Sequence, residues 1–497
     1  MSNTSPVSPL GLRDVQQWDI ETDVVVVGFG GAGACAAIEA ADTGAQVQLF
    51  ELASASGGST ALSSAEIYMG GNGGTRVQKA CGYEEDTENM VQFLMAAFGD
   101  NADEDKVRLY CEQSVMHFDW LVDKGVPFKD SEYKQRAIMA LTDDCLLFTG
   151  NEKAWPFTDS AKPMPRGHNL EVEGDNGGPL FMKIMTENVD KRDNITVHYE
   201  TRALRLIADD NGEVFGIVIR QNQKEKMVRA NKGVILCAGG FGMNPEMVKR
   251  YAPQFTGLEP IGNPGDTGSG ILMAQGVGAG TVNMQECFVT IPFYPPAEMT
   301  YGIMINDKGQ RFINEDCYHG RVGYAALQQQ RLQQCKRIYL VVSAEDAGNY
   351  PEGTWLGADI AATGDSIEEL EQELGLPESS LVATITQYNT HAEKGDDPHY
   401  HKHEAWLKPL STPLVALDVT LNRGTFYPFF TLGGLDSLPS GEVLTPDRHV
   451  IPGLYAAGRT TAGIPRTAAG YASGMSVGDA TFFGRQAGRS AAQRKSR

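Results

Sequence analysis

Residues 23–51, DVVVVGFGGAGACAAIEAADTGAQVQLFE, decide the fold. A short β-branched run ends in glycine and leads into an alanine-rich helical pattern, and VQLFE at 47–51 then predicts a second buried strand. A strand, a helix and a strand within about 30 residues match the size of one βαβ unit. The stretch therefore predicts an α/β protein with a Rossmann-type dinucleotide-binding domain.

Three glycines at the strand-to-helix junction form a GxGxxG motif. The first glycine of this motif allows the tight turn, the second lets the backbone approach a pyrophosphate, and the third lets the helix pack on the strand. Glu51 ends the second strand, where a carboxylate binds ribose hydroxyls. NAD and FAD share this fingerprint. The residues predicted to hold the dinucleotide are Gly28, Gly30, Gly31, Ala32, Gly33 and Glu51.

The segment GGSTALSS (57–64) favours FAD over NAD. A glycine pair and hydroxyls soon after the acidic strand allow backbone and side chains to hydrogen-bond the flavin ring edge near N5. A polar turn is the other interpretation of such a segment. The predicted flavin contacts here are Gly57, Gly58, Ser59 and Thr60.

Two further strand-then-glycine segments lie far downstream, GVILCAGGFG (233–242) and GLYAAGRTTAGIP (453–465). After them, GYASGMSVGDATFFGRQAG (470–488) predicts a glycine-rich entry into a closing helix. The amides of that helix start could face the flavin N1/C2 carbonyl, where negative charge collects on reduction. The cofactor contacts predicted from these segments are Ala238, Gly239, Gly458, Gly474, Ser476 and Val477.

The returning glycine segments indicate one flavin domain that is assembled from distant pieces of the chain. We expect residues 1–284 and 421–497 to form the FAD-binding domain, and residues 285–420 to form an inserted α+β capping and catalytic domain. The alternating segments ITVHYETRALRLIAD and GEVFGIVIRQ, joined at Asp210-Asn211-Gly212, predict a small antiparallel sheet beside the parallel one. Within the insert, Ser366 and Glu369 have the spacing of a helix start.

Composition limits the partners of the chain. The 42 basic and 63 acidic residues among 497 give a net charge of −21, which disfavours nucleic acid and anionic lipid. No apolar run reaches membrane-spanning length and the N-terminus lacks a secretory pattern, so we expect a cytoplasmic protein without membrane insertion. The eight cysteines have no metal-ligand spacing, and the histidine-rich stretch YNTHAEKGDDPHYHKH is interpreted as a solvated loop, so no metal site is expected.

Six motifs in order resemble the fumarate reductase/succinate dehydrogenase flavoprotein superfamily over nearly the whole chain: GFGGAGACAAIEAA, GGSTALSS, GVILCAGGFG, GDTGSGI (265–271), GQRFINED (309–316) and LYAAGRTTAG. The resemblance implies FAD, a capping domain between flavin segments, and hydride transfer between flavin N5 and a substrate carbon. Covalent members of the superfamily attach FAD at the GGST segment, where this chain has no histidine, so non-covalent FAD is expected.

The chain departs from the fumarate reductases at the cations that clamp a dicarboxylate. Their HTMGG reads FTLGG here from Phe430, their late arginine falls near Ala469, and their catalytic arginine falls close to Tyr318. A dicarboxylate would be bound poorly without these cations. Tyr318, Tyr471 and Ser473 suit a neutral ketone instead. The pattern resembles the 3-ketosteroid dehydrogenases, and Tyr-x-Ser before the last helix is most similar to the 3-ketosteroid Δ4-(5α)-dehydrogenase branch.

That resemblance implies a reaction at C4 and C5 of a 3-ketosteroid. Tyr471 and a backbone N–H near Gly474 would donate to the ketone oxygen. Ser473 would receive the C4 proton and pass it through Tyr318 towards solvent, while hydride leaves C5 for flavin N5. An external electron acceptor would then re-oxidise the flavin.

Three alternatives stay open: a 3-ketosteroid Δ1-dehydrogenase, a fumarate-reductase-like alkene reductase, and a flavin electron-transfer subunit. Two further segments have no assigned role in this reaction. PMPRGHN (163–169) either lines the entrance or forms a surface loop, and Arg459 is expected to be structural.

Overall fold

The strand, helix and strand predicted at residues 23–51 are present as β2 (Ile20–Val27), α1 (Gly31–Asp42) and β3 (Val47–Phe50) of a computed structural model. The structure describes residues 4–348 and 356–496. Strands β2 and β3 run parallel, with Val24 opposite Val47 and Val27 opposite Phe50. All four residues are buried, as expected for a parallel strand pair covered on both faces. The predicted βαβ unit is confirmed.

The main sheet has nine strands in the order β1-β8-β9-β10-β2-β3-β7, and β21 pairs with both β10 and β20. Strand β10 joins antiparallel and parallel pairing. Residues 224–229 pair antiparallel with β9, residues 234–236 pair parallel with β21, and residues 228–230 and 233–236 pair parallel with β2. The strands not yet bounded are β1 (Leu10–Gly11), β7 (Ile195–His198), β8 (Arg202–Ala208), β9 (Val214–Gln221), β10 (Lys224–Leu236), β20 (Glu442–Leu444) and β21 (Val450–Ala456).

The predicted antiparallel strands are therefore continuous with the parallel sheet rather than beside it. The segment ITVHYETRALRLIAD also divides into two strands: β7 pairs parallel with β3, and β8 pairs antiparallel with β9. Glu200 lies between them with a φ of +52°, which breaks the extended backbone. The predicted antiparallel pair is confirmed for β8 and β9, but the prediction that residues 195–198 belong to the same antiparallel strand is wrong, because alternation could not reveal the turn at Glu200.

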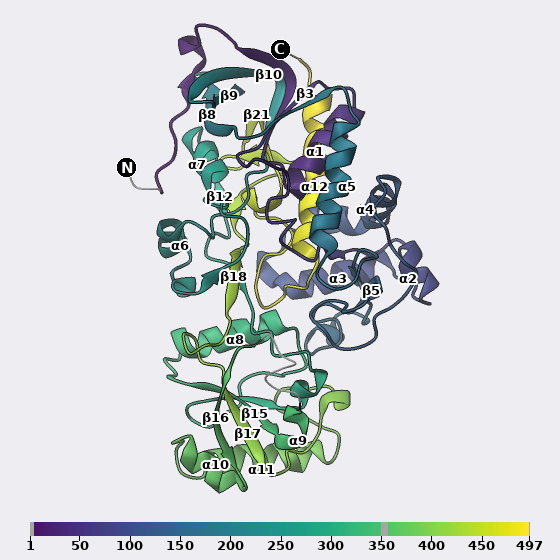
Figure 1. The fold of residues 1–497 in the computed structure, drawn as a ribbon, viewed down its shortest axis with the longest axis vertical. Coiled ribbons are helices and arrows are strands. Elements are labelled where there is room, and N and C mark those ends of the chain that lie inside the picture. The colour runs from purple at the N-terminus through teal and green to yellow at the C-terminus, as the bar shows by residue number, and fades with distance from the viewer. Residues whose placement is uncertain (1–3, 349–355, 497) are drawn as a thin grey trace.

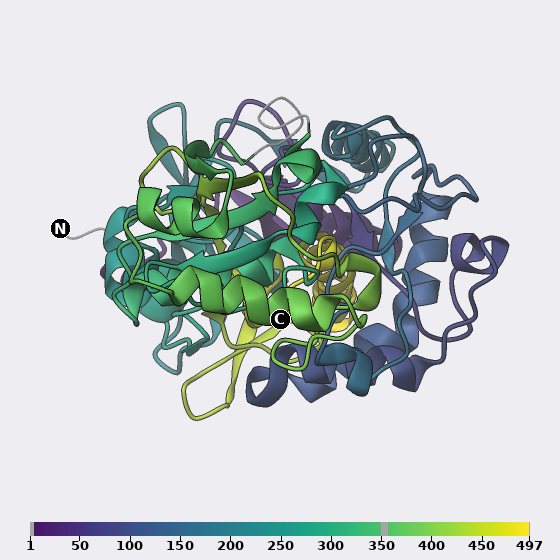
Figure 2. The same cartoon turned by 90° about the horizontal axis from the view of Figure 1, so that it is seen from below.

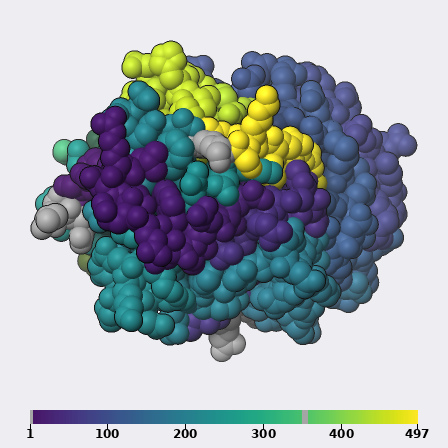
Figure 3. All heavy atoms as spheres, turned by 90° about the horizontal axis from the view of Figure 1, so that it is seen from above, coloured from purple at the N-terminus to yellow at the C-terminus, as the bar shows by residue number. Residues whose placement is uncertain are grey.

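Three long helices lie side by side over the main sheet: α1, α5 (Gly177–Asp190) and α12 (Met475–Gln493) (Figure 1). Helices α1 and α12 approach backbone to backbone, since a Cβ at Gly484 would lie 2.5 Å from the carbonyl oxygen of Ala32. Glu39 of α1 forms ion pairs with Arg485 and Arg489 of α12. Seen from above, this C-terminal segment reaches the surface beside the N-terminal residues (Figure 3).

A second layer of structure, the cap, lies at the lower end of the molecule (Figures 1 and 2). Its four-stranded antiparallel sheet has the order β14-β15-β17-β16. Side chains on alternate positions face opposite sides: Ile303 and Val341 pack with α10 and α11, whereas Met304 and Leu340 pack with α8. The elements are β14 (Ile303–Asn306), β15 (Ile338–Ser343), β16 (Asp359–Gly364), β17 (Leu414–Asp418), α8 (His319–Arg331), α10 (Ile367–Glu373) and α11 (Ser380–Ala392).

Two antiparallel strands carry the chain between the body and the cap. They are β13 (Cys287–Val289) and β18 (Pro428–Thr431), and β18 also pairs with β11 (Glu259–Pro260) of the body. Because both passages of the chain lie in one small sheet, residues far apart in sequence meet at the junction of body and cap (Figure 1).

The remaining elements complete the two layers. No helix among the residues that the structure describes is long and apolar enough to span a bilayer. Every cysteine except Cys81 is buried, and all eight are free thiols.

The other elements are β4 (Ile67–Tyr68), β5 (Leu146–Leu147), β6 (Gly167–His168), β12 (Thr281–Val282), β19 (Gly434–Leu435), α2 (Arg76–Ala80), α3 (Thr87–Phe98), α4 (Glu104–Asp123), α6 (Pro245–Tyr251), α7 (Ser269–Gly276) and α9 (Ala344–Ala347).

Candidate active site

The GxGxxG turn lies where β2 meets α1, against the end of β10. Gly28 has a φ of +102°, and a Cβ there would lie 2.3 Å from the carbonyl oxygen of Cys237. A Cβ at Gly33 would lie 1.9 Å from the carbonyl oxygen of Gly28. Helix α1 starts after Gly30 without a side-chain cap, so its first turn presents backbone amides and the positive end of the helix dipole. This turn has the geometry of a pyrophosphate site.

Glu51 follows β3 and is held by the backbone on two sides. One carboxylate oxygen accepts a hydrogen bond from the amide of Phe29 at 2.7 Å, and the other accepts from the amide of Ala53 at 2.8 Å. These bonds fix the carboxylate beside the turn. Its role towards ribose stays a prediction.

The GGST segment lies on the same turn. The amide of Gly57 donates to the carbonyl of Phe29 at 2.8 Å, and the Thr60 hydroxyl accepts from the amide of Gly31 at 3.1 Å. Gly58 approaches Gly30 so closely that a Cβ on Gly58 would lie 3.1 Å from the Cα of Gly30. A cofactor held at the start of α1 would therefore also meet residues 57–60.

The hydroxyl of Ser59 has two partners within the protein, and its contact with the flavin stays a prediction. This hydroxyl donates to Asp266 at 2.7 Å and accepts from the amide of Asn263 at 2.8 Å, so it ties the GGST segment to the GDTGSGI segment. Asp266 also forms an ion pair with Arg459 at 2.5 Å, in agreement with a structural role for this arginine. The sequence could not reveal this link, because the three residues come from three distant segments.

The other predicted cofactor residues surround the same point. A Cβ at Gly239 would lie 1.9 Å from a carboxylate oxygen of Asp266, and a Cβ at Gly458 would lie 2.9 Å from the Cβ of Ala32. Ala238 precedes Gly239 directly after β10. The glycines of four segments thus let these segments approach one another closely around the turn, and the residues present fit a dinucleotide cofactor.

The start of α12 lies beside strand β4. Gly474 precedes the helix with a φ of +88°, and a Cβ there would lie 2.7 Å from the amide nitrogen of Tyr68. Ser476 and Val477 lie in the first turn of this helix, which has no side-chain cap. The first turn therefore carries the positive end of the helix dipole, and its orientation towards the flavin stays a prediction.

Tyr318 and Ser473 come together from the cap and the body. Tyr318 lies directly before α8, and its hydroxyl is 2.7 Å from the hydroxyl of Ser473. Tyr318 is 3% exposed, whereas Ser473 is half-buried. Burial raises the pKa of Tyr318 well above its ordinary value. At neutral pH the tyrosine is therefore an uncharged hydroxyl that can donate and accept a proton, but it is not a strong base.

Tyr471 lies at the same junction. Its hydroxyl donates to the hydroxyl of Ser476 at 3.0 Å and accepts from the amide of Ser476 at 3.4 Å. Burial raises the pKa of Tyr471 to about 12, so its proton stays in place at neutral pH. The amide that the structure brings to this hydroxyl belongs to Ser476, two residues beyond Gly474. Because this amide donates to the tyrosine oxygen, the tyrosine hydroxyl can turn its own proton towards a carbonyl oxygen.

An aromatic wall surrounds the hydroxyls. The ring of Phe288 lies 4.6 Å from that of Tyr471 and 4.7 Å from that of Phe430. Arg459 lies over Phe430 but is already paired with Asp266. Sequence reasoning missed Phe288, because nothing in β13 distinguishes it from an ordinary core phenylalanine.

Residues 163–169 do not form a surface loop, so that interpretation is wrong. They include β6, which pairs with β4 and β5, and Arg166 is fully buried. Arg166 pairs with the buried Glu85 and donates to the hydroxyl of Tyr68 at 3.2 Å. The segment therefore supports β4, the strand that lies beside the start of α12.

The histidine-rich loop is only partly solvated. Asp397 is buried and pairs with Arg311 at 2.7 Å, and Lys402 is buried beside Glu315. These ion pairs tie the loop to the cap. Among residues 4–348 and 356–496, no cluster of three or more histidine, cysteine or carboxylate side chains could hold a metal ion.

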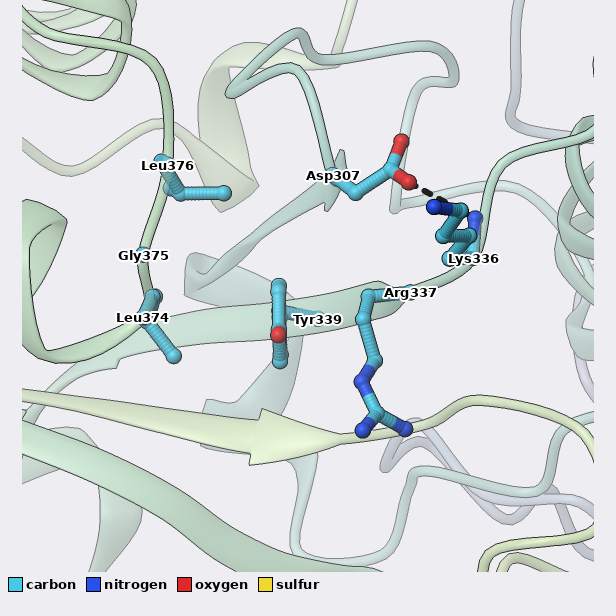
Figure 4. A pocket seen from close by; sticks show the side chains of 7 residues that line it. All are labelled: Asp307, Lys336, Arg337, Tyr339, Leu374, Gly375 and Leu376. Carbon is cyan, nitrogen blue, oxygen red and sulfur yellow. Dashed lines mark hydrogen bonds between the residues drawn. The ribbon is translucent and has the colours of Figure 1, made fainter.

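An open surface hollow of about 530 Å³ lies elsewhere, on the cap (Figure 4). Tyr339 at its centre belongs to the apolar cluster of the cap sheet, whereas Tyr318 and Tyr471 belong to another cluster. None of the predicted site residues lines it. The hollow is lined by Asp307, Lys336, Arg337, Tyr339, Leu374, Gly375 and Leu376.

Comparison with known families and structures gives a consistent picture. Residues 23–474 match the family described as FAD binding domain. The chain is similar to the 3-ketosteroid-Δ4-(5α)-dehydrogenase of Rhodococcus jostii RHA1, whose crystal structure is in complex with 4-androstene-3,17-dione. The two share 42% sequence identity, with a TM-score of 0.92, over 98% of this chain and 100% of that one.

Two curated relatives are more distant. The chain is 26% identical to the 3-oxo-5-alpha-steroid 4-dehydrogenase of Comamonas testosteroni, over 92% of this chain and 97% of that protein. It is 28% identical to the NADH:fumarate oxidoreductase of Klebsiella pneumoniae (strain 342), over 95% of this chain. The match spans only 48% of the length of that oxidoreductase.

Proposed function

This chain belongs to the FAD binding domain family, and from that premise we propose that it dehydrogenates 3-ketosteroids between C4 and C5. It is an FAD-dependent oxidoreductase. The observation that carries the proposal is the 2.7 Å contact between the hydroxyls of Tyr318 and Ser473, with the ring centroid of Tyr471 6.3 Å from that of Tyr318. The similarity to a Δ4-(5α)-dehydrogenase in complex with 4-androstene-3,17-dione supports the same choice of substrate.

The first step of the proposed reaction polarises the 3-ketone. The amide of Ser476 donates to the hydroxyl of Tyr471, and this hydroxyl turns its own proton from Ser476 to the ketone oxygen, where negative charge develops as C4 loses a proton. The raised pKa of Tyr471, about 12, keeps this donor protonated. Phe288 and Phe430 provide an apolar surface for the steroid rings. Enolate character at the oxygen makes the neighbouring C4–H acidic enough to be removed.

The second part moves a proton and a hydride away from adjacent carbons. Ser473 accepts the C4 proton as its own proton passes to Tyr318, and the relay returns it to solvent. When bound, FAD accepts the hydride and its two electrons from C5. The C4–H and C5–H bonds break and the C4=C5 double bond forms. An external two-electron acceptor takes the electrons from the reduced enzyme.

The alternative of fumarate reduction lacks a binding site here. A dicarboxylate needs cationic partners, but the wall at this junction is aromatic and Arg459 is paired with Asp266. The same wall disfavours an electron-transfer subunit without a substrate, because aromatic side chains beside positioned hydroxyls are typical of a ligand site.

The cofactor would lie between the start of α1 and the start of α12. We assign the pyrophosphate to residues 28–33, the ribose to Glu51, and the flavin to residues 57–60, 238–239, 458 and 474–477. Binding would be non-covalent, since residues 57–64 contain no histidine. We further propose the domain boundaries 1–284, 285–420 and 421–497 for the body, the cap and the return of the body.

The proposal is tested with purified protein, a 5α-3-ketosteroid and an artificial acceptor dye. We expect dye reduction with formation of the conjugated 4-ene-3-ketone. In Tyr471→Phe, turnover should fall about 100-fold or more, as for the loss of an oxyanion donor, while the FAD content is unchanged. Turnover of this variant within a few fold of wild type would remove Tyr471 from the mechanism.

A further inference from the structure

We propose that Asn151 is a positioning residue that aligns Tyr318 of the cap with Ser473 of the body. This inference rests on the proposed function, because it concerns the same proton relay. Asn151 lies in the first segment of the body, far in sequence from both residues. No motif pointed to it.

The side-chain amide of Asn151 bridges the two segments that carry the relay. Its oxygen accepts a hydrogen bond from the backbone amide of Tyr318 at 2.9 Å. Its nitrogen donates to the carbonyl of Ala469 at 3.2 Å, just before the Tyr471–Ser473 turn. The residue is 0% exposed. One buried side chain thus connects the start of α8 in the cap to the loop of the body that precedes α12.

The neighbours of Asn151 hold the same loop. The backbone carbonyl of Thr149 accepts a hydrogen bond from the amide of Ser473 at 3.0 Å. The side-chain hydroxyl of Thr149 donates to the carbonyl of Ser473 at 3.2 Å. Gly150 packs so tightly on Ala472 that a Cβ on the glycine would lie 2.4 Å from that of the alanine. Residues 149–151 therefore fix the backbone of Ser473, and Asn151 adds the connection to Tyr318.

This arrangement needs a side chain with both a donor and an acceptor. An amide meets both requirements without charge, whereas a carboxylate would place a negative oxygen against the carbonyl of Ala469. Removal of the amide leaves two buried backbone groups without their partner, and such groups are strongly unfavourable. We therefore expect the segments to separate slightly, which lengthens the contact between the hydroxyls of Tyr318 and Ser473.

Asn389 of α11 provides a matched control. It also makes one donor and one acceptor bond to the backbone, both to Leu410, at 2.9 and 2.8 Å. These bonds lie within the cap, in the cluster that packs α11 on the cap sheet. Asn389→Ala therefore removes the same kind of bridge away from the relay.

The first readout is kinetic. In Asn151→Ala we expect the rate of flavin reduction by a 5α-3-ketosteroid to fall about 10–100-fold, since small misplacements of reacting groups cost this much. Bound FAD and the KM for steroid should change little, and Asn389→Ala should stay within about twofold of wild type. Adding Asn151→Ala to Tyr318→Phe should cause little further loss. Independent losses that multiply in the double variant would contradict action through Tyr318.

The second readout does not depend on the substrate. Hydrogen exchange should become faster in peptides covering residues 315–320 and 469–474 of Asn151→Ala, but not of Asn389→Ala. If Asn151→Ala does not fold, Asn151→Asp keeps the size and the acceptor and should still show faster exchange at 469–474. Exchange and flavin reduction equal to those of Asn389→Ala would overturn the inference. A wild-type enzyme that steroid cannot reduce would instead refute the proposed function, while the exchange data would still test the bridge.

Discussion

The cofactor turn and the catalytic junction are built in opposite ways. The turn at Gly28–Gly33 consists of consecutive residues, and close backbone approaches decide its shape. The junction combines Asn151, Tyr318 and Ser473 from three distant segments, and hydrogen bonds of side chains hold it together. We therefore expect substitutions in the turn to lower cofactor binding. Substitutions at the junction should instead slow the reaction of an enzyme that keeps its flavin.

The largest expected effect lies in the turn. In Gly33→Ala the new Cβ would lie 1.9 Å from the carbonyl oxygen of Gly28, so the backbone must move. Overpacking of this kind costs about 1–3 kcal/mol, and FAD affinity falls about 5–150-fold if binding carries the whole cost. The flavin content of the purified protein measures it. Gly242→Ala is the control, because its Cβ would meet its nearest neighbour at 3.9 Å. Equal flavin contents in Gly33→Ala and Gly242→Ala would contradict the claim that close backbone approaches in the turn hold the cofactor.

The next effect lies at the junction. Ser473→Ala removes the hydroxyl that faces Tyr318, while the backbone bonds to Thr149 remain. Loss of a positioned proton acceptor lowers turnover about 100-fold or more, with FAD still bound. Stopped-flow flavin reduction under anaerobic conditions gives the rate directly. A variant that loses its flavin as well would mean that the two regions are not separable.

A smaller effect concerns pH and the residue next to Tyr318. Burial lowers the pKa of His319 from 6.5 to about 3, so the folded protein holds this histidine neutral. The unfolded chain binds the proton near pH 6.5, and the stabilisation is therefore complete above that pH and lost as the pH falls towards 3. The expected slope is about 1.4 kcal/mol per pH unit.

His319→Gln should reduce this slope, as measured by denaturant unfolding at several pH values between 4 and 7.5. The surface residue His449 supplies the control, and His449→Gln should unfold like wild type. A wild-type slope in His319→Gln would show that the histidine does not contribute to acid sensitivity.

The smallest effect lies in the cap, away from the junction. Ser366 caps α10 by accepting from the amide of Glu369 at 3.1 Å. Ser366→Ala should lower the free energy of unfolding by about 1 kcal/mol. Flavin content and steroid turnover should not change, since the cap sheet separates α10 from Tyr318. Slower turnover in this variant would show that α10 affects the reaction at the junction.

The same contrast explains how far the sequence could be interpreted. The residues around Gly28 are contiguous and sterically constrained, so a short motif predicted the turn, the sheet and the cofactor. Tyr318 and Ser473 lie near recognisable motifs, which made them candidates. Thr149 and Asn151 lie in an irregular segment, and only the folded chain brings them to the relay. The ion pair of Asp266 with Arg459 could not be predicted either, because only the folded chain brings these two distant residues together.

The central claim is that the junction removes hydrogen from C4 and C5 of a 3-ketosteroid. The most direct test mixes the oxidised enzyme anaerobically with 5α-androstane-3,17-dione that carries deuterium either at C5 or at C1. We expect the steroid to bleach the flavin, and we expect deuterium at C5, but not deuterium at C1, to slow this bleaching. Absence of bleaching, or slowing by the C1 label alone, would contradict it.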